Sequence, residues 1–493
     1  MRDKILPAVL GLAFVGLVAF AVARPKSGHE APLVVIQDEG KADAGADASV
    51  VSVDASVDAS ATPDASDGAV PIVKILDRPL RVTTLGLALA APGTMVKEAL
   101  EASRDGRAPR PSVDLELTTV STPQKLEARL IHGGADADGA DVAILSLPDL
   151  VASSERLRAL EPQAFMLVGF SQSTERLHPL GTSPRVPLQG VDVKVFVPAG
   201  ERLASREWMA LFGMDAVQVP LAKVKLLVAD ERPKDATYVA TTFLEKNEGE
   251  HVLSTVEAPG LVPYVAVMTK GMLAAKEPVA RAFAEAWLLG MQRSYVDAGA
   301  AAKRVIGKEG AVFSTASEGA GDLATLVDHL GRISKVSLAD NARFFGLPVK
   351  EGRRAPLQAL ASSMVEGFGE AGLLATPPSW ELVDTKVMAA LAKDVAPSVE
   401  KLECVRARKA PIMARRETGQ TLDEAALGRR IEAAAIAFEG CSIRVSMRGG
   451  EKPATTFVEA TRAKLGLSAE KLAVGKTATQ GAAALVEVVP PAP

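Results

Sequence analysis

Small hydroxyl side chains follow two apolar runs of this chain at the point where each run ends. Residues 142–145 are followed by Ser146, and residues 165–168 are followed, after a short turn, by Ser171. Continuous apolar runs of this length, bounded by turn residues, are typical of strands buried on both faces. In an open α/β sheet, ligands bind at the carboxyl ends of such strands. The two serines are therefore expected where a small molecule would bind.

A binding site of this kind requires few groups. Convergent hydroxyls orient a ligand, and backbone N–H groups at helix N-termini hold an anionic head group. The candidate ligand-binding residues lie at the ends of predicted strands and in the loops beside them: Gly86, Thr94, Ser146, Ser171, Gln172, Ser173, Gly200, Asp235, Thr237 and Tyr238. A Ser or Thr after a strand is commonly a cap or turn residue, so each position also has a purely structural interpretation.

Two motifs could indicate an enzyme, and each lacks its required context. Residues 169–173 read G-F-S-Q-S, close to the G-x-S-x-G elbow of α/β hydrolases, but the last glycine is replaced and L-H-P-L-G at 177–181 would end a following helix. His251 or His329 could serve as the base, although no motif places either. Residues 367–372 match G-x-G-x-x-G after a helix-like stretch rather than a strand, so they are expected to end a helix. No catalytic residues are assigned.

Composition sets limits on the classes of function. A chain of 493 residues implies two to four domains, and 48% apolar residues can form sizeable cores. The net charge of −4 predicts no nucleic-acid partner. With five His and two Cys, there is little material for a transition-metal site, and no metal or cofactor is expected.

The first 26 residues predict membrane targeting. Arg2 and Lys4 precede an apolar run at positions 5–23, roughly 19 residues, enough to span a hydrocarbon core of about 30 Å. A-V-A at 21–23 could be a cleavage site, so both an uncleaved anchor and a cleaved signal remain open. Residues 27–71 are rich in Asp, Ala and Ser, cannot bury enough area to offset chain entropy, and are expected to be a disordered linker.

Strand and helix patterns alternate from residue 72 onward. The expected strands cover 80–89, 113–120, 142–145, 165–168, 191–197, 224–228, 250–256 and 261–268, and the expected helices 95–102, 123–131, 205–212 and 278–296. This alternation is typical of a parallel sheet with right-handed crossovers. Within the last helix, apolar residues recur at four-residue steps through Phe283 and Trp287, which predicts a stripe facing a core.

Several of these segments resemble one family. S-L-P-D at 146–149, the turn at Ser171, D-A at 235–236, the helix with Phe283 and Trp287, and D-N-A-R-F-F-G at 340–346 resemble periplasmic substrate-binding proteins of ABC importers. The sulfonate, nitrate, taurine and thiamine-precursor type is the most similar, over about residues 78–391. The resemblance implies a two-lobe α/β fold of the type II periplasmic-binding-protein class, a small ligand in the cleft, and a permease in the inner membrane as partner.

The same resemblance implies where the lobes begin and end. Lobe 1 would comprise about 72–172 and 260–395, and lobe 2 about 173–259. The chain would cross between them near 169–174 and 255–263.

Residues 396–493 read as a separate small α+β domain. G-Q-T-L-D-E at 419–424 and L-G-L-S-A-E-K-L at 465–472 resemble an OmpA-like domain, although an unrelated α+β module is an equal alternative. Such domains hold peptidoglycan through an Asp in the loop after the central strand and an Arg early in the next helix. Here the loop 448–453 contains no Asp, Ala454 occupies the Arg position, and Arg462 lies two turns too late. Peptidoglycan is therefore not an expected partner.

This C-terminal segment contains the only two cysteines, Cys404 and Cys441. In an exported protein a disulfide bridge between them is favoured over two free thiols. Closing the loop from 404 to 441 would contribute about 4 kcal/mol in the chain-entropy description.

The sequence thus predicts an exported, membrane-tethered solute-binding protein of the periplasm that captures a small organic molecule. The alternative is a structural or interaction protein of the envelope with a degenerate binding fold, and an α/β hydrolase is the third interpretation.

Overall fold

The computed structural model describes residues 73–102, 111–172, 174–184, 187, 191–200, 202–217, 219–242, 251–309, 312–314, 317–318, 322–349, 353–393, 395–397, 412–415, 423–475 and 484–489. The chain divides into two compact units, residues 1–66 and 67–493, and all described residues belong to the second. The apolar run at 5–23, Ser173 and Cys404 lie outside the described residues. Within the described ranges, no helix combines the length and apolar character needed to cross a membrane.

Lobe 1 is built on a six-stranded sheet. Its strand order is β13 (Val312–Phe313), β4 (Leu115–Val120), β2 (Leu80–Leu85), β5 (Val142–Ser146), β12 (Pro263–Thr269) and β6 (Pro162–Phe170). β13, β4, β2 and β5 pair in parallel, as the alternating pattern predicts. The strands β4, β2, β5, β12 and β6 are largely buried on both faces because helices cover each side of the sheet.

The expectation of an all-parallel sheet is wrong for the other half. β12 inserts between β5 and β6 and runs antiparallel to both. It enters in this direction because the chain returns from lobe 2 at the edge where β5 and β6 end. β5 and β6 consequently point the same way, so their carboxyl ends share one edge. In this register Tyr264 of β12 lies opposite Ser146 on one side and Gly169 on the other.

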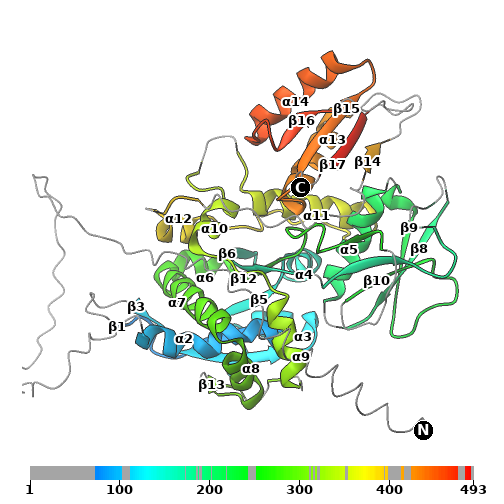
Figure 1. Cartoon of the computed structure of the whole chain (residues 1–493). Coiled ribbons are helices and arrows are strands. Elements are labelled where there is room, and N and C mark those ends of the chain that lie inside the picture. Colours follow the sequence, from blue (N-terminus) through cyan, green and yellow to red (C-terminus); the bar gives the residue numbers. More distant parts are fainter. Residues whose placement is uncertain are drawn as a thin grey trace, which may run out of the picture. The chain divides into compact units, whose positions relative to one another are not determined.

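Helices α2 (Ala91–Ala102) and α7 (Glu277–Val296) pack side by side in lobe 1 (Figure 1). A Cβ placed on Gly290 would lie 2.3 Å from the Pro92 carbonyl oxygen, so a glycine is required for this close approach. The apolar stripe of α7 is confirmed, with Phe283 and Trp287 fully buried. The strand expected over 80–89 ends at Leu85 and is followed by a 3₁₀ turn, and the helix expected from 95 begins four residues earlier.

The remaining elements of lobe 1 are β1 (Val73–Lys74) paired with β3 (Pro111–Ser112), η1 (Ala88–Ala90), α3 (Pro123–His132), α4 (Leu147–Ser153), α6 (Lys270–Ala275), α8 (Ala298–Gly307), α9 (Leu323–Gly331), α10 (Leu338–Phe344), α11 (Pro356–Glu370) and α12 (Lys386–Leu391). The helix expected over 123–131 is confirmed as α3, and it begins with a side-chain cap: Thr122 Oγ1 accepts from Lys125 N, and Pro123 follows. The buried side chain of Asn341 in α10 hydrogen-bonds both backbone polar groups of Leu167 in the edge strand β6. Its Oδ1 accepts from Leu167 N at 2.8 Å, and its Nδ2 donates to Leu167 O at 3.1 Å.

Lobe 2 contains a five-stranded sheet with one long helix. The strand order is β11 (Leu253–Ser254), β7 (Arg176–Pro179), β10 (Tyr238–Thr241), β8 (Val193–Pro198) and β9 (Val224–Ala229). In the chain, α5 (Leu203–Ala216) and η2 (Leu221–Lys223) connect β8 to β9. Figure 1 shows α5 next to β8, β9 and β10. The strand expected over 250–256 is reduced to Leu253–Ser254 in the described part of that segment.

The chain passes twice between the two sheets, and the passages are hydrogen-bonded to one another. Ser171 N donates to Val262 O at 2.9 Å, and Thr174 N donates to Thr255 Oγ1 at 3.0 Å. The mixed α/β fold with two sheet-based lobes is confirmed.

The C-terminal residues form a four-stranded sheet with two helices. The chain order is β14 (Ile412–Arg415), α13 (Glu424–Ala437), β15 (Ser442–Met447), α14 (Glu451–Leu465), β16 (Leu472–Val474) and β17 (Ala484–Val489), and the sheet order is β14-β17-β15-β16. α14 begins at Glu451, inside the segment 448–453 that was expected to be a loop, which leaves residues 448–450 as the loop after β15. The Arg462 side chain makes a hydrogen bond within the C-terminal domain, because its Nε donates to Leu472 O at 2.7 Å. The OmpA-like assignment remains a prediction.

Candidate ligand site between the lobes

Ser146 stands where β5 becomes α4. Its Oγ accepts from Asp149 N at 3.1 Å, and it donates to Asp149 Oδ2 at 2.5 Å. Both side chains are buried. This side-chain cap satisfies the first turn of α4 and brings the Asp149 carboxylate to the edge where β5, β12 and β6 meet.

The first passage between the lobes brings a second carboxylate to the same edge. Ser171 Oγ donates to Glu175 Oε2 in a short hydrogen bond, and both residues are fully buried. The other oxygen, Oε1, lies 3.6 Å from Nη1 of Arg202. Glu175 therefore joins the end of β6 in lobe 1 to the loop before α5 in lobe 2.

Lobe 2 supplies Arg202 and Ser205 from the start of α5. Arg202 is the N-cap residue and is held in the left-handed region, at φ 60°, which is costly for a residue with a Cβ. Its guanidinium carbon lies 5.7 Å from the ring centroid of Tyr264. Ser205 Oγ donates to Ser146 Oγ at 2.9 Å, which is a direct hydrogen bond between the lobes.

Several polar atoms of this cluster have no hydrogen-bond partner among the described residues: Asp149 Oδ1, Glu175 Oε1 and Tyr264 Oη. Each belongs to a side chain that is at most 2% exposed. A buried polar atom left unsatisfied costs about 1–3 kcal/mol, so a cluster of them requires an explanation. We call these residues, together with Ser146, Ser171, Arg202 and Ser205, the interlobe cluster.

Burial is the largest cause of the pKa shifts in and around the interlobe cluster. Burial raises the pKa of Asp149 to about 6, although the Ser146 hydrogen bond and the Arg202 charge act to lower it. Glu207 of α5 has a pKa raised to about 7 by burial and by the nearby Asp149 charge. Burial and the Arg202 charge lower the pKa of His329 to about 4, which keeps this imidazole neutral at pH 7. Burial thus disfavours the ionised forms of both Asp149 and Glu207 at this edge.

The remaining predicted site residues in lobe 1 fill structural roles. Gly86 turns the chain after β2 at φ 84°. Thr94 is buried within α2 and donates to Ala91 O at 2.7 Å. Gln172 follows Ser171 and donates its backbone N–H to Arg332 O at 2.7 Å.

The lobe 2 candidates fall on two opposite edges of its sheet. Gly200, at φ 107°, precedes Arg202 at the carboxyl end of β8. Asp235, Thr237 and Tyr238 lie at the amino end of β10, which runs parallel to β8. There Asp235 contacts Lys194 Nζ at 2.6 Å, Thr237 Oγ1 donates to Lys194 O at 3.0 Å, and Tyr238 Oη donates to Pro184 O at 2.6 Å. The structure brings together Ser146 and Ser171 but does not bring these three residues to them.

Sequence reasoning missed Asp149, Glu175, Arg202, Ser205 and Tyr264. One signal was present: Ser146 and Asp149 form an S-x-x-D capping pattern directly after a buried strand, which places a carboxylate at a strand end. No comparable signal marks Glu175 or Arg202, which reach the site through contacts between distant segments.

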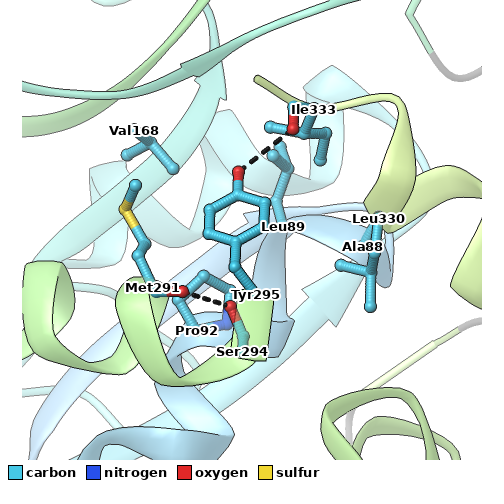
Figure 2. Close-up of a pocket in the computed structure, with 9 residues that line it drawn as sticks. All are labelled: Ala88, Leu89, Pro92, Val168, Met291, Ser294, Tyr295, Leu330 and Ile333. Atoms are coloured by element: carbon cyan, nitrogen blue, oxygen red, sulfur yellow. Dashed lines mark hydrogen bonds between the residues drawn. The ribbon is translucent and has the colours of Figure 1, made fainter. Parts of the chain in front are cut away.

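A small pocket lies within lobe 1 (Figure 2). Tyr295 reaches across it and donates through Oη to Ile333 O at 3.1 Å, while Ser294 donates to Met291 O at 2.8 Å. The lining is largely apolar, and the space open to the centre of a water molecule is about 20 Å³. This volume can hold a water molecule but not an organic ligand.

The enzyme motifs lack their required surroundings in the structure. Ser171 is followed by the strand β7 rather than by the helix that a nucleophile elbow needs. His251 Nε2 lies 3.1 Å from Glu257 Oε1. Residues 367–372 close helix α11, as predicted, with Gly372 at φ 73°. The described residues contain no group of three or more His, Cys, Asp or Glu suited to a metal ion.

Comparisons with known proteins give distant structural similarities. No protein-family model matches the chain, and no curated protein matches it. The chain is similar to a periplasmic sulfonate-binding protein of a putative sulfonate ABC transporter from Methylobacillus flagellatus KT, at 12% identity and TM-score 0.42, covering 66% of this chain and 98% of that one. It is also similar to the periplasmic nitrate-binding protein of Synechocystis PCC 6803, at 12% identity and TM-score 0.39, covering 68% and 94%.

A third similar structure is the ligand-binding component of an ABC-type import system from Staphylococcus aureus with zinc bound. The identity is 12% and the TM-score 0.40, over 65% of this chain and 100% of that one.

Proposed function

We propose that this chain is an exported solute-binding protein that captures a small organic molecule between its two lobes and supplies an ABC permease in the inner membrane. The observation that carries the proposal is the interlobe cluster. Its unpartnered oxygens are buried where both passages and the N-termini of α4 and α5 converge. A ligand enclosed at this place would satisfy those atoms when the lobes close on it.

The chemistry of the unpartnered atoms indicates the class of ligand. Asp149 Oδ1 and Glu175 Oε1 are carboxylate oxygens, which accept hydrogen bonds and cannot donate them while ionised. An anion without donors would leave Asp149 Oδ1 unsatisfied and would be repelled by its charge, while Glu175 Oε1 already faces Arg202 Nη1 at 3.6 Å. A protonated amino group supplies up to three donors and a positive charge. The ligand is therefore proposed to carry an amino group.

The N-terminal segment extends the proposal to location. The apolar run at positions 5–23 would hold the protein at the inner membrane after export, and the linker at 27–71 would keep the lobes within reach of the permease. Cell fractionation with N-terminal sequencing tests this point. A soluble product that begins at Arg24 would show a cleaved signal and no tether.

Two contacts between the lobes favour the alternative of an envelope interaction protein. Ser205 and Ser146 already bond across the lobes, and Arg202 already faces Glu175. In that case the contacts of the cluster would hold the two lobes together permanently, in a binding fold that no longer binds a ligand.

A matched pair of probes separates these possibilities. Taurine and ethanesulfonate share a sulfonate and differ in the amino group. Taurine, but not ethanesulfonate, is expected to raise the melting temperature of the soluble part from residue 72. Ligand at 100 times Kd stabilises the folded state by about 2.7 kcal/mol, a shift of several degrees. Other amines, amino acids, nitrate and thiamine precursors complete the screen.

Two variants control the experiment. Asp149→Asn should abolish the taurine shift, and Glu101→Gln, an exposed carboxylate on α2, should keep it. Equal shifts with both sulfonates would refute the amino-group requirement while leaving solute binding intact. No shift across the whole screen, together with no small molecule retained in native mass spectrometry, would refute solute binding and support the interaction protein.

A further inference from the structure

Helix α13 of the C-terminal domain contacts both lobes through consecutive residues. Arg429 Nε lies 2.8 Å from Glu366 Oε1 on α11 of lobe 1. Arg430 Nη2 lies 2.8 Å from Asp215 Oδ1 on α5 of lobe 2. Two neighbouring positions of one helix are thus bonded to two different lobes.

Further ion pairs join the same helix and its C-terminal turn to lobe 1. Arg354 Nη2 lies 3.0 Å from Glu432 Oε2. Arg343 of α10 forms an ion pair with Glu439, and the Glu439 side chain is only 13% exposed. Pairs as exposed as Arg429–Glu366 contribute little singly, but partly buried pairs arranged as a set fix a docking geometry.

The end of α13 also contacts the second passage between the lobes. Gly260 N donates to Ala437 O at 3.0 Å. A Cβ on Gly260 would lie 2.2 Å from Ile436 O, so any other residue here would push the helix away. The passage that must bend when the lobes move is therefore in direct backbone contact with the C-terminal domain.

Aromatic packing around Trp208 of α5 connects lobe 2 with lobe 1, with the second passage and with the end of α13. Its ring centroid lies 6.2 Å from Phe368 of α11 and 5.5 Å from Phe212 of α5. Phe212 in turn lies 6.0 Å from Phe438, directly after α13. Trp208 Nε1 donates to Leu261 O at 3.2 Å, in the second passage. Lobe 2, lobe 1, the passage and α13 thus form one packed junction.

We propose that α13 is a strap that holds the two lobes closed, so that lobe opening requires the C-terminal domain to undock. Opening turns lobe 2 relative to lobe 1 about the two passages, and the closed arrangement is marked by the Ser205–Ser146 bond. α13 cannot keep its contacts with α5, α11 and Gly260 during that rotation, because the three contact points would separate. Docking of α13 therefore controls access to the interlobe cluster, independently of which ligand the cluster binds.

The test measures the distance between the lobes in the full chain without added ligand. Labels are attached through non-canonical amino acids at Lys97 of α2 and Lys225 of β9, both exposed, so that the native cysteines are left alone. Single-molecule energy transfer then reports closed and open populations. Arg430→Glu places two negative charges together and should raise the open population about tenfold.

Reversing both charges of the pair tests whether the Arg430–Asp215 contact itself keeps the lobes closed. The double variant Asp215→Arg with Arg430→Glu restores the pair in the opposite sense and should return the wild-type distribution. Lys452→Glu on α14, the same change in charge at an exposed position of the same domain, should have no effect. Phe438→Ala removes the contact with Phe212 without changing charge and should also open the lobes. Unchanged distributions for both Arg430→Glu and Phe438→Ala would overturn the proposal, as would an effect of Lys452→Glu equal to that of Arg430→Glu.

Discussion

Asp149→Asn should make the ligand-free protein more stable at neutral pH while removing its ability to bind. Asp149 is 1% exposed, and its pKa is about 6 in the folded state against 3.8 for an unperturbed Asp. Asparagine retains an oxygen that can accept from the Ser146 hydroxyl. Its amide nitrogen would replace the unpartnered Oδ1, so one unsatisfied polar atom is exchanged for another.

The magnitude follows from the shift in pKa. A difference of about 2 pKa units corresponds to about 3 kcal/mol between protonated and ionised forms. Because the folded-state pKa is raised, stability from this group is fully present below about pH 4 and is lost as pH rises through about 6. Wild type should therefore lose about 3 kcal/mol between pH 4 and pH 7 on account of Asp149, and the variant should lose none of it. At pH 7 the variant is expected to be about 1–3 kcal/mol more stable.

Urea unfolding of wild type and variant at pH 4, 5.5 and 7 measures this difference. Each protein is followed by fluorescence and circular dichroism, with Glu101→Gln as the control whose exposed carboxylate should not change the pH dependence. A variant destabilised by a similar amount at every pH would refute the reasoning. It would show that Asp149 contributes mainly as the capping partner of Ser146, without a penalty for its charge.

Three further predictions concern stability. Asn341→Ala should cost about 1–3 kcal/mol in urea unfolding, because it leaves both backbone polar groups of the buried Leu167 without partners; an unchanged midpoint would contradict this. Gly290→Ala should cost about 1–3 kcal/mol by forcing α7 away from α2, whereas Gly271→Ala, with open space around it, should be nearly neutral. Peptide mapping without reductant should recover Cys404 joined to the buried Cys441, and reduction should lower the stability of the C-terminal domain by about 4 kcal/mol; two alkylatable thiols in the native protein would show that the bridge is absent.

Local sequence determined the elements and their ends. The apolar runs before Ser146 and Ser171 became buried strands, and the Thr122–Pro123 pair became a capped helix start. The four-residue recurrence through Phe283 and Trp287 became the buried face of α7. These outcomes were predictable because side-chain periodicity, capping hydrogen bonds and proline geometry act over a few residues, and each acts before any long-range contact forms.

Tertiary structure alone decided which of those ends meet. The insertion of β12 between β5 and β6 put Tyr264 beside Ser146, and the docking of α5 brought Arg202 to Glu175. The same strand order sent Asp235 and Thr237 to the opposite edge of the lobe 2 sheet. A local pattern specifies that a strand is buried but says nothing about its neighbour, because the partner is chosen by packing between segments far apart in the chain. The gathering of carboxylates and an arginine into one buried cluster therefore follows from strand order and helix docking, which no window of the sequence contains.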